Sequence, residues 1–112
     1  MKDVIIGIDI GGTHLRIGAV DRSGQAIHFE KHESREVCGD GGSAQRLIAL
    51  IRDYLAKSGL AERMAALAVG FPSTVSRDKR IVYSSPNLPL GGEGGLDGQD
   101  VVALLQAAFG VP

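Results

Sequence analysis

The segment Asp9-Ile10-Gly11-Gly12-Thr13 is the part of this sequence best suited to bind a phosphate group. Two successive glycines allow backbone N–H groups to face one anion, and Thr13 adds a hydroxyl donor. An ionised Asp9 only accepts hydrogen bonds, so beside a phosphate it needs a cation such as Mg²⁺, which proteins hold through one or two carboxylates and phosphate oxygens. The alternative is a plain hairpin turn, whose glycines supply positive φ and whose Asp9 caps the turn.

This motif joins two strand-like segments. Residues 4–8 form a continuous apolar run, which is typical of a strand covered on both faces. Residues 15–19 alternate between apolar and other side chains, as a second strand does. The sequence contains no G-x-x-x-x-G-K-[ST] and no G-x-G-x-x-G between a strand and a helix. A phosphate bound by this motif would therefore lie at a hairpin.

The segments that follow must hold this hairpin in place. Residues 26–32 alternate as a third strand, with Ile27 and Phe29 on one face. Because the links between the three strands are short, they predict an antiparallel meander. His28 and His32 would lie about 13 Å apart along this strand, at ~3.3 Å per residue, so they cannot share a metal ion.

A helix and a further strand are predicted next. Apolar residues at i, i+3 and i+4 predict a helix over residues 43–58, with Ser43 as its N-cap and Gly59 just past its end. Residues 65–71 read as a second buried strand. The order strand, helix, strand predicts that this strand is parallel to the first in the same sheet.

The last part of the chain predicts a short extended piece at residues 80–84 and a glycine-rich loop. Asp97 is expected to cap a final helix, which Gly110 ends. The predicted order is β-β-β-α-β-α, which makes the fold class α/β with a mixed sheet. A dinucleotide-binding domain would instead begin β-α-β.

Composition excludes several classes of function. The chain has 112 residues with 12 basic and 13 acidic side chains, a balance too neutral for a large nucleic-acid footprint. Cys38, the single cysteine, excludes an internal disulfide framework and a zinc site built on cysteines of this chain. No apolar run approaches the ~20 residues that span a bilayer. We expect a cytoplasmic protein with no signal peptide, no membrane partner and no nucleic-acid partner.

Three motifs resemble known families. Residues Gly7–Arg16 are similar to the first phosphate motif of the actin-like ATPase superfamily. Downstream, Gly70-Phe71-Pro72-Ser73-Thr74-Val75 resembles the G-x-P-G-x-V loop of the ROK family, and Ser85-Pro86-Asn87-Leu88-Pro89-Leu90 resembles its P-N-L segment. The motifs occur in the family's order and span residues 4–90. The sequence thus resembles the amino-terminal, RNase H-like lobe of a ROK sugar kinase.

The resemblance implies transfer of the γ-phosphoryl group of ATP to a sugar hydroxyl, with Mg²⁺. By matching position, Asp9 would help to hold the metal through phosphate and water. The phosphates would be contacted by Gly11, Gly12, Thr13 and His14, and the sugar side would be lined by Pro72, Ser73, Thr74, Val75 and Asn87. Ser73 departs from the family's usual glycine, which puts the sugar preference in doubt. Residues 70–90 look most like members that phosphorylate D-allose, so an allose-like hexose is the lead substrate.

The resemblance also implies what lies outside these residues. The family's catalytic base is an Asp in an N-D-x-N-like segment after the last predicted helix, and the sequence ends at Pro112 before it. We therefore interpret residues 1–112 as an amino-terminal lobe that lacks the carboxy-terminal lobe and is inactive alone. The full-length protein is expected to be a homo-oligomer.

Two other functions remain as alternatives. One is a sugar-sensing ROK-type regulator, although only three residues precede the first strand, which leaves no room for a DNA-binding helix-turn-helix. The other is a non-catalytic module of the same fold. The intact Asp9 and glycine pair favour the kinase.

Overall fold

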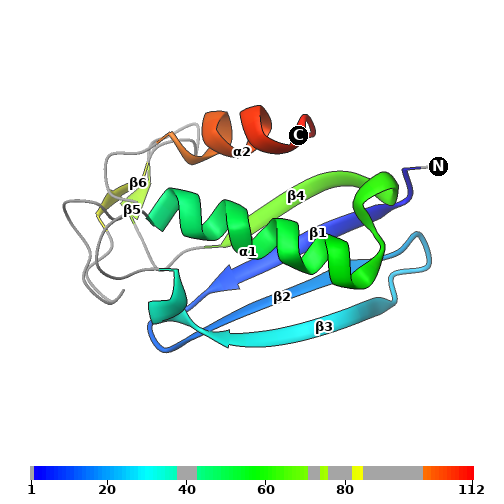
Figure 1. Ribbon diagram of the computed structural model, residues 1–112, viewed down its shortest axis with the longest axis horizontal. Coiled ribbons are helices and arrows are strands. Elements are labelled where there is room, and N and C mark those ends of the chain that lie inside the picture. The colour runs from blue at the N-terminus through cyan, green and yellow to red at the C-terminus, as the bar shows by residue number, and fades with distance from the viewer. Residues whose placement is uncertain (1, 38–42, 71–73, 76–81, 85–99) are drawn as a thin grey trace.

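Four strands form one mixed sheet in the order β3-β2-β1-β4 (Figure 1). They are β1 (Val4–Ile10), β2 (His14–Val20), β3 (Ala26–Glu33) and β4 (Met64–Gly70). The antiparallel pairs β1–β2 and β2–β3 confirm the predicted meander, and the parallel pair β1–β4 confirms the predicted crossover through a helix. The computed structural model describes residues 2–37, 43–70, 74–75, 82–84 and 100–112.

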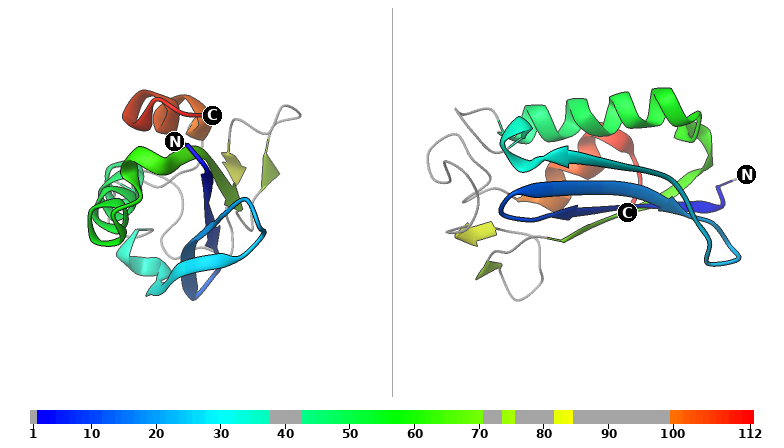
Figure 2. Two further views of the ribbon diagram at one scale, coloured as in Figure 1. Left: turned by 90° about the vertical axis from the view of Figure 1, so that its right-hand side faces the viewer. Right: turned by 90° about the horizontal axis from the view of Figure 1, so that it is seen from below.

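Two helices and several short elements complete the described chain. They are η1 (Ser34–Glu36), α1 (Ser43–Ser58), η2 (Ala61–Arg63), β5 (Thr74–Val75), β6 (Val82–Ser84) and α2 (Val101–Phe109). Both α-helices lie on the same side of the four-stranded sheet (Figure 2). β5 and β6 pair with each other in a separate antiparallel ladder. Over the described residues, neither α1 nor α2 has the length and apolar character needed to cross a bilayer.

The helix ends agree only in part with the predictions. Gly59 and Gly110 follow their helices with φ of +71° and +67°, as expected of glycines at C-termini. Ser43 is already the first helical residue, and its hydroxyl has no hydrogen-bond partner among the described residues, so the predicted cap is wrong. Asp100 rather than Asp97 caps α2, because its side chain accepts a hydrogen bond of 2.9 Å from the N–H of Ala103.

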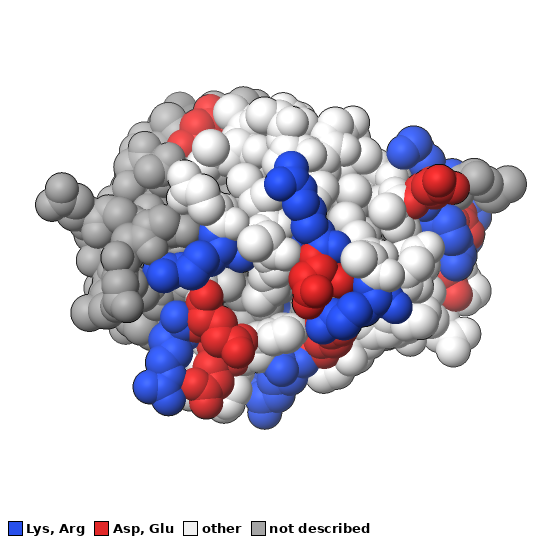
Figure 3. Space-filling view, in the orientation of Figure 1, with Lys and Arg blue, Asp and Glu red and all other residues white. Residues whose placement is uncertain are grey.

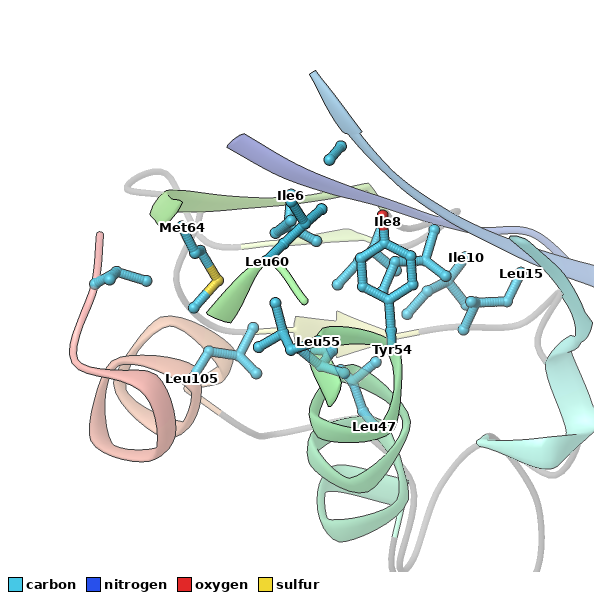
Figure 4. Close-up of a cluster of buried hydrophobic side chains, with 14 of the residues drawn as sticks. Ile6, Ile8, Ile10, Leu15, Leu47, Tyr54, Leu55, Leu60, Met64 and Leu105 are labelled. Carbon is cyan, nitrogen blue, oxygen red and sulfur yellow. The ribbon is translucent and has the colours of Figure 1, made fainter. Parts of the chain in front are cut away.

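One continuous core lies between the sheet and the helices. The alternate residues of β1 that face α1 are all buried, and Leu47, Tyr54 and Leu55 of α1 pack against them (Figure 4). The buried hydrophobic residues are Val4, Ile6, Ile8, Ile10, Leu15, Ile17, Ala19, Val37, Leu47, Ile51, Tyr54, Leu55, Leu60, Met64, Val101, Leu105 and Val111. This core fixes the sheet against α1, and with it the ends of β1 and β2.

The opposite face of the sheet is open, which contradicts the prediction that β1 is covered on both faces. Ile5 of β1 is 48% exposed and Val20 of β2 is 43% exposed. β4 is also only half-buried, although its sequence reads as a buried strand. Continuous apolar sequence in β1 and β4 therefore marks a face that the described residues leave uncovered.

A β-bulge in β3 contradicts the prediction that Ile27 and Phe29 lie on the same face of the sheet. His28 has a φ of +51°, and the register with β2 shifts between Ile17 and Ala19. The extra residue reverses the alternation, so Ile27 packs against the core while Phe29 lies on the open face and is 63% exposed. A strict period of two, which put Ile27 and Phe29 together, fails for this reason.

Charged groups are paired across the face of the molecule that α1 covers. Figure 3 shows acidic and basic side chains side by side over this face. Among the pairs, Lys57 contacts Asp53 at 3.0 Å and Glu30 at 3.6 Å. His32 lies between two carboxylates, with Nε2 3.0 Å from Glu30 and Nδ1 3.2 Å from Glu36. Neither sign of charge dominates this face.

A bidentate ion pair ties the start of β1 to the start of β4. The guanidinium of Arg63 donates to both carboxylate oxygens of Asp3 at 2.8 Å, and the N–H of Asp3 donates to the carbonyl of Arg63 at 2.9 Å. The hydrogen bond from Arg63 holds the pKa of Asp3 below its ordinary value. Asp3 therefore stays ionised, and the pair intact, to lower pH than an isolated carboxylate allows.

We expect Asp3→Asn to destabilise the chain at neutral pH by an amount that shrinks in acid. Because the pKa of Asp3 is lowered on folding, its stabilisation is present above the unfolded value of about 3.8 and is lost as pH falls through the folded value. Urea unfolding of both proteins between pH 7 and pH 2 measures this difference. Glu62→Gln, at a residue with no ion pair among those described, is the control. A difference that stays constant over this range would contradict the prediction.

Candidate functional site

The connection between β1 and β2 is a tight turn with backbone donors that no described residue uses. The N–H of Gly11 donates to the carbonyl of His14 at 2.9 Å and closes the turn. Gly12 and Thr13 are exposed, and their N–H groups donate no hydrogen bond to any described residue. Two adjacent, unpaired N–H groups at the tip of a turn can bind an anion, as the sequence predicts.

Neither glycine of the turn has a positive φ, and Gly11 serves the turn through the space that its missing Cβ leaves. Among the described glycines, positive φ occurs at Gly24, Gly59 and Gly110, and neither Gly11 nor Gly12 has it. The interpretation that this pair supplies left-handed backbone is therefore wrong. A Cβ at Gly11 would instead lie 3.0 Å from the carbonyl oxygen of His14, the same oxygen that accepts the closing hydrogen bond. Gly11 avoids this tight contact at a point where the backbone folds back on itself.

Asp9 stands just before the turn on the open face of the sheet. Its neighbours across the sheet are Arg16 of β2 and Gly70 of β4. The carboxylate is exposed, and it makes no hydrogen bond and no ion pair with the described residues. It is therefore free to bind a cation or water on the side of the sheet that the helices do not cover.

This donor set fits a magnesium ion that arrives with a phosphate. The described residues contain no group of three or more His, Cys, Asp or Glu side chains that could hold a metal by themselves. Mg²⁺ is commonly bound by one or two carboxylates together with phosphate oxygens and water. The Asp9 carboxylate and, in the turn that follows it, the N–H donors of Gly12 and Thr13 that no described residue uses fit that pattern. Bound there, Mg²⁺ would neutralise charge on phosphate oxygens.

Two shallow hollows adjoin the turn. One, of about 290 Å³, is lined by Gly12, Thr13, Glu33 and Arg35. The other, of about 480 Å³, lies over the open sheet face and includes Asp9 and Arg16. The turn thus separates a hollow at the end of β3 from one above the sheet.

An ion pair balances the charge of the first hollow. The Nε of Arg35 donates to Glu33 at 2.7 Å, and this hydrogen bond holds the pKa of Glu33 below its ordinary value and raises that of Arg35. Both groups are charged at neutral pH, so Arg35 offsets the repulsion that Glu33 would exert on an anion at Gly12 and Thr13.

The described residues include only part of the predicted sugar-binding side of the site. Thr74 and Val75 form β5, paired with Ser84 and Val82 of β6. Figures 1 and 2 place this small ladder beyond the carboxyl ends of β1 and β4, the end of the sheet that also carries the turn. The predicted residues Pro72, Ser73 and Asn87 lie outside the described residues. His14, also predicted to contact phosphates, begins β2 and contributes its carbonyl to the turn.

Sequence reasoning missed one residue of this site. Ser34 follows β3, is fully buried, and donates its hydroxyl to the carbonyl of Gly11 at 2.5 Å. Its N–H also donates to the carbonyl of Thr13 at 2.9 Å. A serine after a strand carries no local pattern that points to a turn 23 residues earlier, so only the pairing of β2 with β3 reveals the contact.

Two curated proteins resemble this chain in sequence. A glucokinase from Thermotoga maritima is 28% identical over 85 residues, which cover 76% of the chain and 26% of that protein. An erythritol kinase from Brucella abortus is 36% identical over 98 residues, which cover 80% of the chain and 18% of that protein. The chain therefore spans about a quarter or less of the length of these relatives.

Solved structures share the fold. A ROK family glucokinase from Streptomyces griseus, in complex with glucose and AMPPNP, matches 97% of this chain and 31% of its own with a TM-score of 0.71 at 21% identity. A ROK family transcriptional regulator, a homologue of the E. coli MLC protein, matches 100% of this chain and 27% of its own with a TM-score of 0.79 at 18% identity. The predicted mixed α/β sheet is thereby confirmed as a fold shared with these ROK family structures.

The sequence likeness to a family extends over nearly the whole chain. The model of the ROK family matches residues 5–112, which include the turn after Asp9, the sheet and both helices. This chain belongs to the ROK family.

Proposed function

We propose that this chain is the phosphate-binding lobe of an ATP-dependent sugar kinase, the activity residing in a longer polypeptide. The observation that carries the proposal is one short segment, in which the Asp9 carboxylate and, after it, the N–H groups of Gly12 and Thr13 all lack a partner among the described residues. A carboxylate and N–H donors that no described residue uses suit a phosphate that is bound together with Mg²⁺. Family membership and a kinase among the sequence relatives support the same conclusion.

Each residue of the turn has a proposed role in phosphoryl transfer. The N–H groups of Gly12 and Thr13, with the Thr13 hydroxyl, hold phosphate oxygens of ATP, while Gly11 and His14 keep the turn closed. Asp9 orients Mg²⁺ through water or phosphate. Such transfer depends on positioning and charge stabilisation from both sides of a cleft. The group that accepts the proton of the sugar hydroxyl is proposed to lie beyond residue 112.

The proposed acceptor is a hexose, with an allose-like hexose as the lead. Pro72, Ser73, Thr74, Val75 and Asn87 are proposed to line its site. Hexose epimers differ in one hydroxyl, so discrimination must come from paired donors and acceptors. Asn87 offers both, and Ser73 offers a hydroxyl where the family's usual glycine has none.

We expect Asn87→Ala to lower kcat/KM for the sugar by about a hundredfold, because a sugar hydroxyl is left without its hydrogen-bond partner. KM for ATP should stay within about twofold, because the ATP site is unchanged. Ser73→Gly should broaden acceptance from allose toward glucose and mannose. Both are measured in the longer polypeptide against allose, glucose, mannose and N-acetylated hexosamines. Unchanged ratios among these sugars in both variants would place residues 73 and 87 outside the sugar site.

The experiment that tests the proposed function is a coupled assay of ADP release. The longer polypeptide should release ADP from Mg-ATP only when a hexose is present, and residues 1–112 alone should not. A regulator of the same family, whose fold this chain shares, would bind sugar without consuming ATP. Sugar binding in calorimetry without ADP release would therefore favour the regulator. The predicted homo-oligomer is checked by light scattering on the same sample.

A further inference from the structure

Among the described residues outside the β1–β2 connection, only Ser34 donates hydrogen bonds to two backbone carbonyls of that connection. Its hydroxyl binds the carbonyl of Gly11 and its N–H binds the carbonyl of Thr13. The side chain of Ser34 is completely buried, so its hydroxyl is not exposed to solvent. η1 keeps Ser34 in place, because the carbonyl of Ser34 accepts a hydrogen bond of 3.1 Å from the N–H of Val37.

The bond to Gly11 determines where the next N–H points. A trans peptide is planar, and its C=O and N–H groups point in opposite directions. The carbonyl of Gly11 and the N–H of Gly12 belong to one peptide. When Ser34 draws that carbonyl inward, the N–H of Gly12 must face outward, toward the solvent side of the turn where it has no partner among the described residues.

Glycine makes such a restraint necessary. A Gly-Gly peptide has wide conformational freedom, because neither residue carries a Cβ that limits φ and ψ. The closing bond from Gly11 to His14 holds the ends of the turn but leaves this central peptide free to rotate. Only the Ser34 hydroxyl, among the described residues, fixes it.

We propose that Ser34 is a positioning residue of the phosphate site: its hydroxyl fixes the Gly11–Gly12 peptide so that the Gly12 N–H faces the bound phosphate. The role of Ser34 in phosphate binding rests on the proposed function. Its role in orienting the Gly11–Gly12 peptide rests on geometry alone. Ser34 does not touch the ligand itself. It acts through Gly12, and its effect should fall on ATP and not on the sugar.

The chain offers a closely matched control. Ser43 is also completely buried, but its hydroxyl has no hydrogen-bond partner among the described residues. Ser34→Ala and Ser43→Ala remove the same atom from the same degree of burial, and only the first releases the turn. Ser34→Thr keeps the hydroxyl and serves as the rescue. Ser34→Ala also retains the N–H bond to Thr13, so η1 and β3 remain joined to the turn.

The first measurement needs no nucleotide. In NMR spectra of the 112-residue chain, Ser34→Ala should shift the Gly11 carbonyl carbon and the Gly12 amide, Ser34→Thr should restore both, and Ser43→Ala should leave them unchanged. Unchanged Gly11 and Gly12 signals in Ser34→Ala would overturn the proposal. So would equal shifts in Ser43→Ala, because they would indicate a general effect of cavity formation.

The second measurement uses Mg-ATP and the longer polypeptide. Ser34→Ala should raise KM for ATP about tenfold and leave KM for the hexose unchanged, as expected from loss of one fixed donor. A parallel rise in both constants, or no change in either, would overturn the positioning role. If the wild-type protein neither binds nor uses Mg-ATP, the proposed function fails, and the NMR result alone decides whether Ser34 fixes the peptide.

Discussion

Asp9→Ala is expected to lower kcat of the longer polypeptide by a hundredfold or more, with the fold intact. The carboxylate is exposed and makes no hydrogen bond or ion pair with the described residues, so its removal breaks neither kind of interaction there. Its loss removes the proposed protein ligand of Mg²⁺, and groups that stabilise charge in this way typically contribute about 10²–10³ in rate. The measurement is kcat for hexose-dependent ADP release, together with circular dichroism of the variant.

Two further variants show whether loss of metal binding is the reason for the lower kcat. Asp9→Asn keeps the shape of the side chain but not its charge, so it should lose nearly as much activity as Asp9→Ala. Asp53→Asn, which removes an exposed carboxylate on α1, should change kcat by less than about twofold. The dependence of rate on Mg²⁺ concentration should shift for the Asp9 variants only. A folded Asp9→Ala protein with near-normal kcat would show that the metal role is wrong.

Gly11→Ala is expected to disrupt the phosphate site and the hairpin together. The new Cβ would lie 3.0 Å from the carbonyl oxygen of His14, and both groups are backbone, so no side chain can move aside. The turn would have to open and weaken the bond that closes it. We expect a loss of about 1–3 kcal/mol in the free energy of unfolding, as is usual for overpacking, and a rise in KM for ATP of at least about tenfold.

Gly7 supplies the control for the stability measurement. It also lies in β1, but a Cβ added there would meet no heavy atom within 4 Å among the described residues. Gly7→Ala should therefore leave the melting temperature of the 112-residue chain close to that of the wild type. If Gly11→Ala melts at the same temperature as Gly7→Ala and binds Mg-ATP normally, the close approach at the turn has no functional consequence.

Local sequence patterns predicted the parts of the fold that follow simple periods. The apolar runs and short links predicted the meander, and the helical spacing after Ser43 predicted α1 and the parallel placement of β4. The face of Phe29 was mispredicted because one residue, His28, adopts a left-handed φ that no sequence rule assigns to a histidine within a strand. Coverage of β1 was mispredicted because an apolar run reports how apolar a strand is and not whether a partner lies on each face.

The residues of the candidate site were likewise predicted from the sequence only in part. Asp9 and the two glycines were found from sequence because their types and spacing are adjacent in the chain. Ser34 was not found, because its contact with Gly11 depends on the register of β2 with β3, which the bulge at His28 alters. The cap of α2 was placed three residues early, since both Asp97 and Asp100 are chemically suitable and only the start of the helix decides between them.

The arrangement of the meander bears on the order in which this lobe folds. The turn, Asp9 and Ser34 all lie within the first 34 residues, and their strands pair with neighbours in sequence. β4 instead pairs with a strand far away in the sequence, as the contact between Asp3 and Arg63 across 60 positions illustrates. Contacts of low sequence separation form with less loss of chain entropy and usually form earlier. We therefore expect the turn between β1 and β2 to form with the meander before β4 pairs with β1.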